Sequence, residues 1–335
     1  MTNKNKQKRS SESKAAQEEK RRALKEQAAK DAKSLEEVPE IKPQAFSKGQ
    51  LNAFILIGVG IAKLFNIGKA IRMGGEPAKL CLLYFLDDDV CSDDGLNTFL
   101  RFKYMLSLQV LVTVVTIALQ CWKSEDVLIR YTGSLLVPVF TTSLALVANN
   151  LVLNQRAVWY REIMMAFVVT VTTMPGKSHL PFLTGTKQQN NTVQSLVLMT
   201  FCCFTLFDAF EWGSTIFQVG SQGIAESLFN PAFFATLGSE VSPVLAVLAQ
   251  FFVIDRFIMA TSIFFAWYYL KESHHRTILF FLAATKVAAV FFQYPQLEDS
   301  MVLASSTKQT IEIGLAVLGF VAWGMPSMSW KTKTV

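Results

Sequence analysis

Five ionisable side chains lie within long, mostly apolar stretches of the sequence. Asp208 and Glu211 share one stretch, the adjacent Asp255 and Arg256 share a second, and Lys286 interrupts a third. If these stretches are helices, Asp208 and Glu211 project from the same face, because they are three residues apart. A charge in the middle of a membrane-spanning helix is costly unless it meets a partner or a polar cavity. We therefore expect these five side chains to lie at similar depth and to face the interior of the protein.

These charges have two interpretations. In the first, Lys286 and Arg256 neutralise Asp208 and Asp255, and the ion pairs hold the helices together. In the second, the carboxylates exchange protons along a pathway for protons or other cations. Three acids against two bases leave one carboxylate without an obvious counter-ion, which favours the pathway. The sequence therefore predicts a channel or proton-coupled transporter of a small ion or solute, with a non-catalytic membrane scaffold or assembly factor as the alternative.

The elements that would position these residues are eight apolar segments. A helix crosses the ~30 Å hydrocarbon core of a bilayer in about 20 residues. The segments therefore predict an all-α fold, a polytopic transmembrane helical bundle of seven or eight spans. The lower count applies if residues 51–86 form a re-entrant or interfacial pair, because Lys63 interrupts the first segment. The eight segments are 51–67, 104–122, 132–153, 157–174, 194–218, 243–270, 277–294 and 309–326.

A charged arm precedes the apolar segments. The chain has 335 residues and is 51% hydrophobic, yet residues 1–50 hold 13 of its 32 Lys and Arg and 8 of its 26 Asp and Glu. The arm is rich in Ala, Glu, Lys and Gln, a composition that favours helix. We expect a partly helical cytosolic arm and linker at 1–50, a transmembrane domain at 51–326 and a short cytosolic tail at 327–335. Residues 1–45 would either stay in solvent or bind a cytosolic partner or an anionic membrane surface.

The charges of the loops and of the two ends predict the orientation. Loop 271–276 (KESHHR) is basic and is expected in the cytosol, while loop 219–242 has no Lys or Arg and is expected in the lumen. Lys331 and Lys333 are the fifth and third residues from the carboxyl terminus, and they resemble the dilysine retrieval signal of endoplasmic reticulum membrane proteins. This resemblance implies residence in the endoplasmic reticulum or early secretory pathway, with both termini cytosolic. The alternative is a simple positive flank after the last span.

The motifs of most enzymes and metal sites are missing from the sequence. Three histidines, His179, His274 and His275, are too few for a multi-histidine metal box, so we predict no metal and no other cofactor. No P-loop, Rossmann fingerprint or Gly-x-Ser-x-Gly elbow occurs, so an enzyme is not expected. A lipid-modifying enzyme is the third-ranked function. His274 and His275 are interpreted as part of a solvated loop.

The remaining composition adds two expectations. No basic patch is interleaved with aromatic residues, so nucleic acid is not an expected partner, whereas the lipid bilayer is. The five cysteines form no disulfide framework, and four of them have apolar neighbours in the sequence. We expect those four to be small residues of the apolar core: Cys81, Cys121, Cys202 and Cys203.

One tripeptide resembles a known family. Asn230-Pro231-Ala232 is similar to the Asn-Pro-Ala triplet of the aquaporin superfamily, in which two half-helices meet at paired Asn-Pro-Ala turns. A second Pro-led segment begins at Pro77, and Pro-led segments in both halves are typical of internally repeated transporters. The earlier segment lacks the asparagine, however, and the number of predicted spans differs from that of aquaporins. Pro231 is therefore also interpreted as the first residue of an ordinary helix.

Overall fold

The structure, a computed structural model, describes residues 21–22, 24–27, 46–72, 96–148, 192–228, 243–292 and 306–326. This part of the chain is helical, so the predicted all-α class is confirmed for it. Residues Met1–Phe46 and Ser47–Val335 are two separate units, and in the first unit residues 21–22 and 24–27 are helical and exposed. The helices of the second unit are α2 (Lys48–Arg72), α4 (Leu96–Cys121), α5 (Glu125–Ala148), α7 (Val193–Leu228), α9 (Pro243–Tyr269), α10 (Glu272–Phe292) and α11 (Ser306–Gly324).

Four of these helices are long and apolar enough to cross a membrane. The apolar parts coincide with four of the predicted segments, those that begin at 51, 104, 194 and 243. Helices α5, α10 and α11 occupy three further predicted segments, and the segment 157–174 lies outside the described residues. The four apolar parts are Lys48–Lys69, Lys103–Cys121, Val193–Glu211 and Phe251–Tyr269.

Local signals explain where two of the helices begin. The Ser47 amide donates to Gln50 Oε1 at 3.0 Å, and the Gln50 amide donates to Ser47 Oγ at 3.3 Å, so a reciprocal capping box starts α2. Thr192 Oγ1 accepts a hydrogen bond from the Ser195 amide at 3.3 Å at the start of α7. These caps satisfy amides that have no partner inside the helix.

Helix α7 is longer than the sequence indicated. It runs for 36 residues to Leu228, so the predicted lumenal loop 219–242 begins as helix, which corrects its boundary. No proline interrupts the chain between Val193 and Leu228, and its glycines weaken the helix without ending it. At 1.5 Å per residue the helix is about 54 Å long, well beyond the ~30 Å core of a bilayer.

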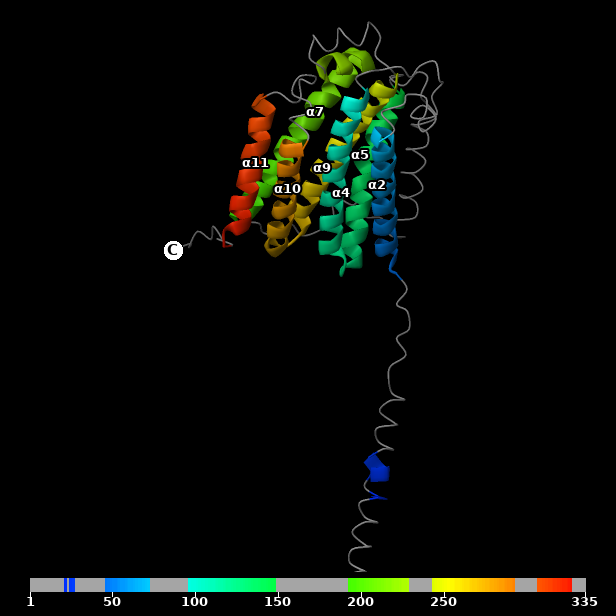
Figure 1. The fold of residues 1–335 in the computed structure, drawn as a ribbon, viewed down its shortest axis with the longest axis vertical. Helices are drawn as coiled ribbons and strands as arrows, with labels where there is room; N and C mark the ends of the chain where they lie inside the picture. Colours follow the sequence, from blue (N-terminus) through cyan, green and yellow to red (C-terminus); the bar gives the residue numbers. More distant parts are fainter. Residues whose placement is uncertain are drawn as a thin grey trace, which may run out of the picture. The chain divides into compact units, whose positions relative to one another are not determined.

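Helix α9 is the central helix of the second unit. It contacts α4, α5 and α7, while α2 packs against α4 and α5, and α10 packs against α4, α7 and α11. Figure 1 shows α2 and α11 at opposite edges of this group. The ring of Tyr131 is fully buried 5.0 Å from that of Phe265 on α9. Gly319 allows α11 to approach α10 closely, because a Cβ there would lie 2.8 Å from the Cβ of Ala283.

Seven helix ends meet at one end of the bundle, which we name the α9–α10 end. These are the first turns of α2, α5, α7 and α10 and the last turns of α4, α9 and α11, at the lower end of the helices in Figure 1. Among the described helices, neighbours in the chain alternate in direction except for α5 and α7, which both begin at this end. Side-chain contacts join the ends: Gln50 Nε2 to the Trp122 carbonyl at 3.5 Å, Gln194 Nε2 to the Ala322 carbonyl at 3.0 Å, Arg276 Nε to the Trp323 carbonyl at 3.0 Å, and His274 Nδ1 to Gln120 Oε1.

The basic loop 271–276 is mostly helix, which corrects the interpretation of its histidines. Helix α10 begins at Glu272, and His275 in its first turn is fully buried. Its Nε2 lies 3.1 Å from the Ala266 carbonyl oxygen and donates to it, so His275 ties α10 to the last turn of α9. Burial lowers the pKa of His275 below its ordinary value, because the charged imidazolium is poorly solvated there.

Candidate functional site

Two neighbouring charges on α9 face different helices. Successive residues of a helix are about 100° apart around the axis, so Asp255 and Arg256 point in different directions. Asp255 Oδ2 accepts hydrogen bonds from Lys103 Nζ and, at 3.2 Å, from Ser107 Oγ. Lys103 and Ser107 are four residues apart on α4 and therefore share a face. The Lys103 and Asp255 side chains are 5% and 14% exposed, so this pair is part of the interior.

Arg256 faces α7 instead. Its Nη2 lies 3.6 Å from Asp208 Oδ2, and its guanidinium carbon lies 5.2 Å from the centroid of the Phe252 ring. The base that pairs with Asp208 is therefore Arg256. The Nε and Nη1 atoms of Arg256 are buried and have no hydrogen-bond partner among the described residues.

Lys286 has a partner that the sequence analysis did not consider. Its Nζ donates to Glu312 Oε1 at 2.7 Å, across the α10–α11 contact, and the two side chains are 3% and 10% exposed. The expected pairing of Lys286 with Asp208 is wrong, because Lys286 faces α11 and not α7. Glu211 pairs with Lys308 of α11 at 3.6 Å, at a more exposed position.

Four ion pairs thus connect five helices in the order α10, α11, α7, α9 and α4. Asp208 and Glu211 lie three residues apart on α7, yet they pair with different helices, α9 and α11. The expected surplus of one carboxylate is also wrong, since each of the four carboxylates has a base within 4.0 Å. The pairs are Lys286–Glu312, Lys308–Glu211, Arg256–Asp208 and Lys103–Asp255.

Three members of these pairs were missed by the sequence analysis. Lys103 lies one residue before the predicted segment 104–122, and Lys308 lies one residue before the predicted segment 309–326. Glu312 lies inside the last segment, one helical turn after Lys308. A search for charges that extended each apolar segment by one turn would have found all three.

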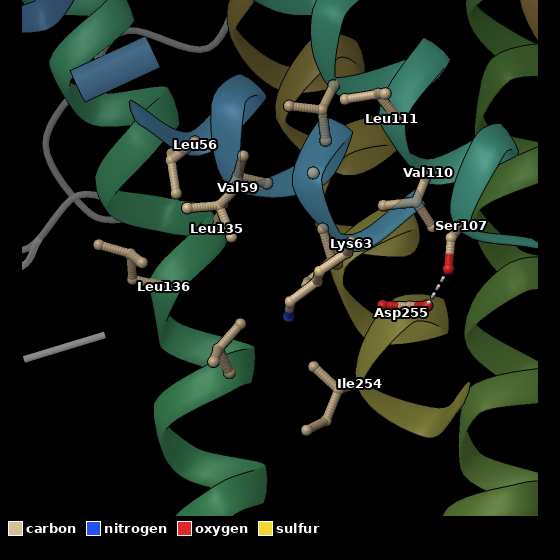
Figure 2. Close-up of a pocket in the computed structure, with 14 residues that line it drawn as sticks. Leu56, Val59, Lys63, Ser107, Val110, Leu111, Leu135, Leu136, Ile254 and Asp255 are labelled. Carbon is tan, nitrogen blue, oxygen red and sulfur yellow. Dashed lines mark hydrogen bonds between the residues drawn. The ribbon is translucent and has the colours of Figure 1, made fainter. Parts of the chain in front are cut away.

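A cavity of about 130 Å³ adjoins the Lys103–Asp255 pair between α2, α4, α5 and α9. Its wall is formed mostly by Leu, Val and Ile side chains, and Asp255, Ser107 and Lys63 are the polar lining residues. Figure 2 shows Lys63 reaching into the cavity from α2, opposite Asp255 and its hydrogen bond from Ser107. The cavity therefore combines an apolar body with one charged side.

Phe251 brings two lysines to that charged side. It precedes Asp255 by one helical turn, so the two residues share a face of α9. The Nζ atoms of Lys63 and Lys103 lie 5.4 Å and 5.9 Å from the centroid of its ring, distances typical of cation–π contacts. In the part of the chain that the structure describes, the charged groups beside the cavity thus include the ammonium groups of Lys63 and Lys103 and the carboxylate of Asp255.

Other predicted residues lie elsewhere. Lys331, Lys333 and the Asn230-Pro231-Ala232 triplet lie outside the described residues. Cys121 and Cys202 are buried as expected, whereas Cys203 is exposed, so its prediction as a core residue is wrong. Within the described ranges no group of three or more His, Cys, Asp and Glu side chains is arranged to hold a metal ion.

Comparison with known proteins assigns no family to this chain. No protein-family model matches it, and no curated protein and no solved structure shows significant similarity to it. Its function is therefore argued from the arrangement of its own residues.

Proposed function

We propose that the protein is a multi-pass membrane protein that transports a small solute or ion, coupled to protons, through the polar site at Asp255. The observation that carries this proposal is that Asp255, which pairs with Lys103, lines a cavity between α2, α4, α5 and α9. Ionisable residues within membrane-spanning segments are costly, and they commonly mark ion and proton routes. A cavity beside such a pair offers a solute a binding place among the helices. Seven or eight spans and two cytosolic termini are part of the proposal.

The residues have different roles in this proposal. Asp255 carries the proton, and Lys103 and Ser107 hold its carboxylate when no proton is bound. The residues that line the cavity do not include Asp208, Glu211, Arg256 or Lys286. Each of these four forms an ion pair that joins two helices. We assign these four to the packing of α7, α9, α10 and α11 around the transport route.

The test is proton flux in liposomes that contain the purified protein. Acidification of the lumen is followed with a pH-sensitive dye while small solutes are supplied outside. Asp255→Asn should abolish solute-driven proton movement, because an amide cannot carry a proton. Glu211→Gln is the matched control, because Glu211 is half exposed and does not line the cavity. The proton flux of this variant should equal that of the original protein. Equal loss in both variants, or flux in neither the variants nor the original protein, would contradict the proposal.

A second candidate function is a membrane scaffold or assembly factor. The observation that favours it is that Asp208, Glu211, Asp255 and Glu312 all have basic partners, as purely structural charges would. Deletion of residues 1–45 separates the two functions. A transporter should keep its flux without the arm, whereas a scaffold that recruits a partner through the arm should lose that partner.

We also propose residence in the endoplasmic reticulum or early secretory pathway, with Lys331 and Lys333 as the retrieval signal. Receptors read such signals only from the cytosolic side. Replacing both lysines with serine should move a tagged protein onward to later compartments. An unchanged distribution would leave the two lysines as a positive flank of the last helix.

A further inference from the structure

We propose that the cavity between α2, α4, α5 and α9 binds a small uncharged molecule that has a compact hydrocarbon group and one hydroxyl group. The hydroxyl group donates a hydrogen bond to Asp255 Oδ1. Such a molecule would be the solute of the proposed transport function, and its biological meaning rests on that function. The binding itself can be tested without transport.

The Asp255 carboxylate has one oxygen atom that the surrounding helices leave open. Lys103 Nζ and Ser107 Oγ both donate to Oδ2, and none of the described residues donates a hydrogen bond to Oδ1. Asp255 lines the cavity, and Figure 2 shows the oxygen that Ser107 does not bond directed away from Ser107, toward the cavity. Both oxygens of a carboxylate accept hydrogen bonds. Oδ1 can therefore accept one from a molecule in the cavity.

The bound molecule is expected to be uncharged, because the charged groups beside the cavity already have partners. Asp255 pairs with Lys103. Lys63 lies 5.4 Å from the centroid of the Phe251 ring and has at least one further interaction. A charged ligand would lose its hydration at a wall formed mostly by Leu, Val and Ile side chains, which is costly. A hydroxyl group can donate to Oδ1 without bringing a charge.

The size and wall of the cavity limit the hydrocarbon part of the molecule. The cavity volume of about 130 Å³ is close to the ~150 Å³ of an engineered apolar cavity, in another protein, that binds benzene. Each of the four helices contributes apolar side chains to the wall, for example Leu56, Val110, Leu135 and Ile254. Transfer of a single ring or a short branched chain from water to this wall is favourable. A whole lipid is too large for this volume.

The first experiment measures the binding of phenol to the full-length protein in detergent by equilibrium dialysis. Equal detergent on both sides of the dialysis membrane balances the partition of the probe into micelles. At neutral pH, where phenol is uncharged, we expect saturable binding. Fluorobenzene has nearly the same size and no hydroxyl group, so it should bind at least about tenfold more weakly, the loss expected for a hydrogen bond to a charged acceptor. Equal binding of the two probes, or no saturable binding of phenol, would overturn the proposal.

Two further probes test whether the preferred ligand is uncharged. At neutral pH benzoate carries a negative charge and benzylamine a positive charge, each on a single aromatic ring. Both should bind at least about tenfold more weakly than phenol, because a charge loses its hydration at an apolar wall. Equal or tighter binding of either probe would overturn the assignment of an uncharged molecule.

The hydrogen bond to Asp255 is tested by removing Asp255 and Lys103 together, because the loss of one member of a buried pair destabilises a fold. Lys103→Met with Asp255→Val removes both charges and nearly keeps the shape of the Asp255 side chain. Phenol and fluorobenzene should then bind with the same affinity. If this double variant does not fold, Asp255→Asn is the second variant, and the preference for phenol should fall because a neutral amide is the weaker acceptor. An undiminished preference would show that another group accepts the hydrogen bond.

Variants of α2 locate the site in the cavity. Gly60→Leu fills the cavity, while Gly58→Leu makes the same change two residues away, at an exposed position where a Cβ has no neighbour within 4 Å. Only Gly60→Leu should abolish phenol binding. Because a Cβ at Gly60 would lie 2.9 Å from Leu111 Cδ1, Val59→Phe is the second filling variant if Gly60→Leu does not fold.

Two results separate this site from the proposed transport function. Phenol binding without any solute-driven proton flux would keep the site and remove transport. Proton flux that depends on Asp255 and is driven by a charged solute, without phenol binding, would keep transport and remove the uncharged ligand. Phenol binding that survives both Gly60→Leu and Val59→Phe would show that the cavity is not the binding site.

Discussion

Lys286 and Glu312 form a buried ion pair between α10 and α11, with 2.7 Å between Nζ and Oε1. Their side chains are 3% and 10% exposed, so the pair is removed from solvent on both sides. Gly319 lies two turns after Glu312 on α11 and holds the same two helices in close contact. We therefore expect the ion pair and the close packing of α10 against α11 to stabilise each other.

The first prediction concerns this pair. Lys286→Met alone should lower the free energy of unfolding by about 3–5 kcal/mol, because it leaves the buried Glu312 carboxylate without a partner. Lys286→Met with Glu312→Leu should recover most of that loss, since both charges disappear together. Thermal unfolding in detergent measures both. The matched control is Lys308→Met with Glu211→Leu, an exposed pair whose removal should cost about 1 kcal/mol or less.

The second prediction concerns Asp208 and its partner. Asp208→Asn and Arg256→Met should be coupled in a double-mutant cycle, because the two side chains form a pair at 3.6 Å. Asp208→Asn and Lys286→Met should instead be additive to within about 0.5 kcal/mol, because each belongs to a different pair. The free energies of unfolding of the three single variants and the two double variants check both statements. Rescue of Asp208→Asn by Lys286→Met would contradict the pairing described above.

The helical segments were predictable from the sequence because long apolar runs fix helices by length alone. The apolar parts of α2, α4, α7 and α9 coincide with predicted segments. The end of α7 was not predictable in this way, because the polar residues after 218 ended the apolar run but not the helix. Hydropathy thus locates the apolar part of a helix and misses the turns that extend beyond it.

The partners of the charges were less predictable. The sequence indicated that Asp208, Asp255 and Lys286 need partners, and each has one. Which partner each takes depends on which helices are neighbours and on rotation about the helix axis, and neither can be read from hydropathy. Lys103 in particular was missed because it lies one residue before the predicted segment 104–122, although α4 begins at Leu96 and the Lys103 side chain is 5% exposed.

The third prediction concerns pH. The pKa of His275 is lowered by burial, so the folded protein keeps this imidazole neutral while the unfolded chain binds a proton below its ordinary pKa of 6.5. The stability contribution is therefore complete above about pH 6.5 and is lost as the pH falls below it. His275→Gln can still donate to the Ala266 carbonyl and should reduce this acid sensitivity. The pKa of His274 is also lowered, so His274→Gln should reduce it as well, though less, because His274 is only partly buried.

The measurement is the melting temperature in detergent at neutral and mildly acidic pH. At neutral pH, where His275 is neutral in both states, His275→Gln should change the melting temperature less than it does in acid. The double variant, His274→Gln with His275→Gln, lacks both imidazoles. If acid lowers the melting temperature of this variant as much as that of the original protein, the role of His275 is contradicted.

The fourth prediction concerns the sidedness of the α9–α10 end. Two exposed serines lie at this end: Ser124 on the α4–α5 connection and Ser273 in the first turn of α10. Arg72 is exposed at the opposite end, in the last turn of α2. In a protein without its native cysteines, Ser124→Cys and Ser273→Cys should react with a membrane-impermeant maleimide from the same side. Arg72→Cys should react only from the other side. The proposed orientation places the first two in the cytosol, because the basic residues gather there.

Sealed microsomes with the cytosolic face outward distinguish the possible results. Ser124→Cys and Ser273→Cys should be labelled without permeabilisation, and Arg72→Cys only after detergent is added, which also shows that each cysteine is reactive. Labelling of all three from one side would mean that α2 does not cross the membrane between Lys48 and Arg72. The contacts of His274 with Gln120 and of His275 with Ala266 hold the last turns of α4 and α9 and the first turn of α10 together. Labelling of Ser124→Cys and Ser273→Cys from opposite sides would therefore contradict the described packing of these three helices.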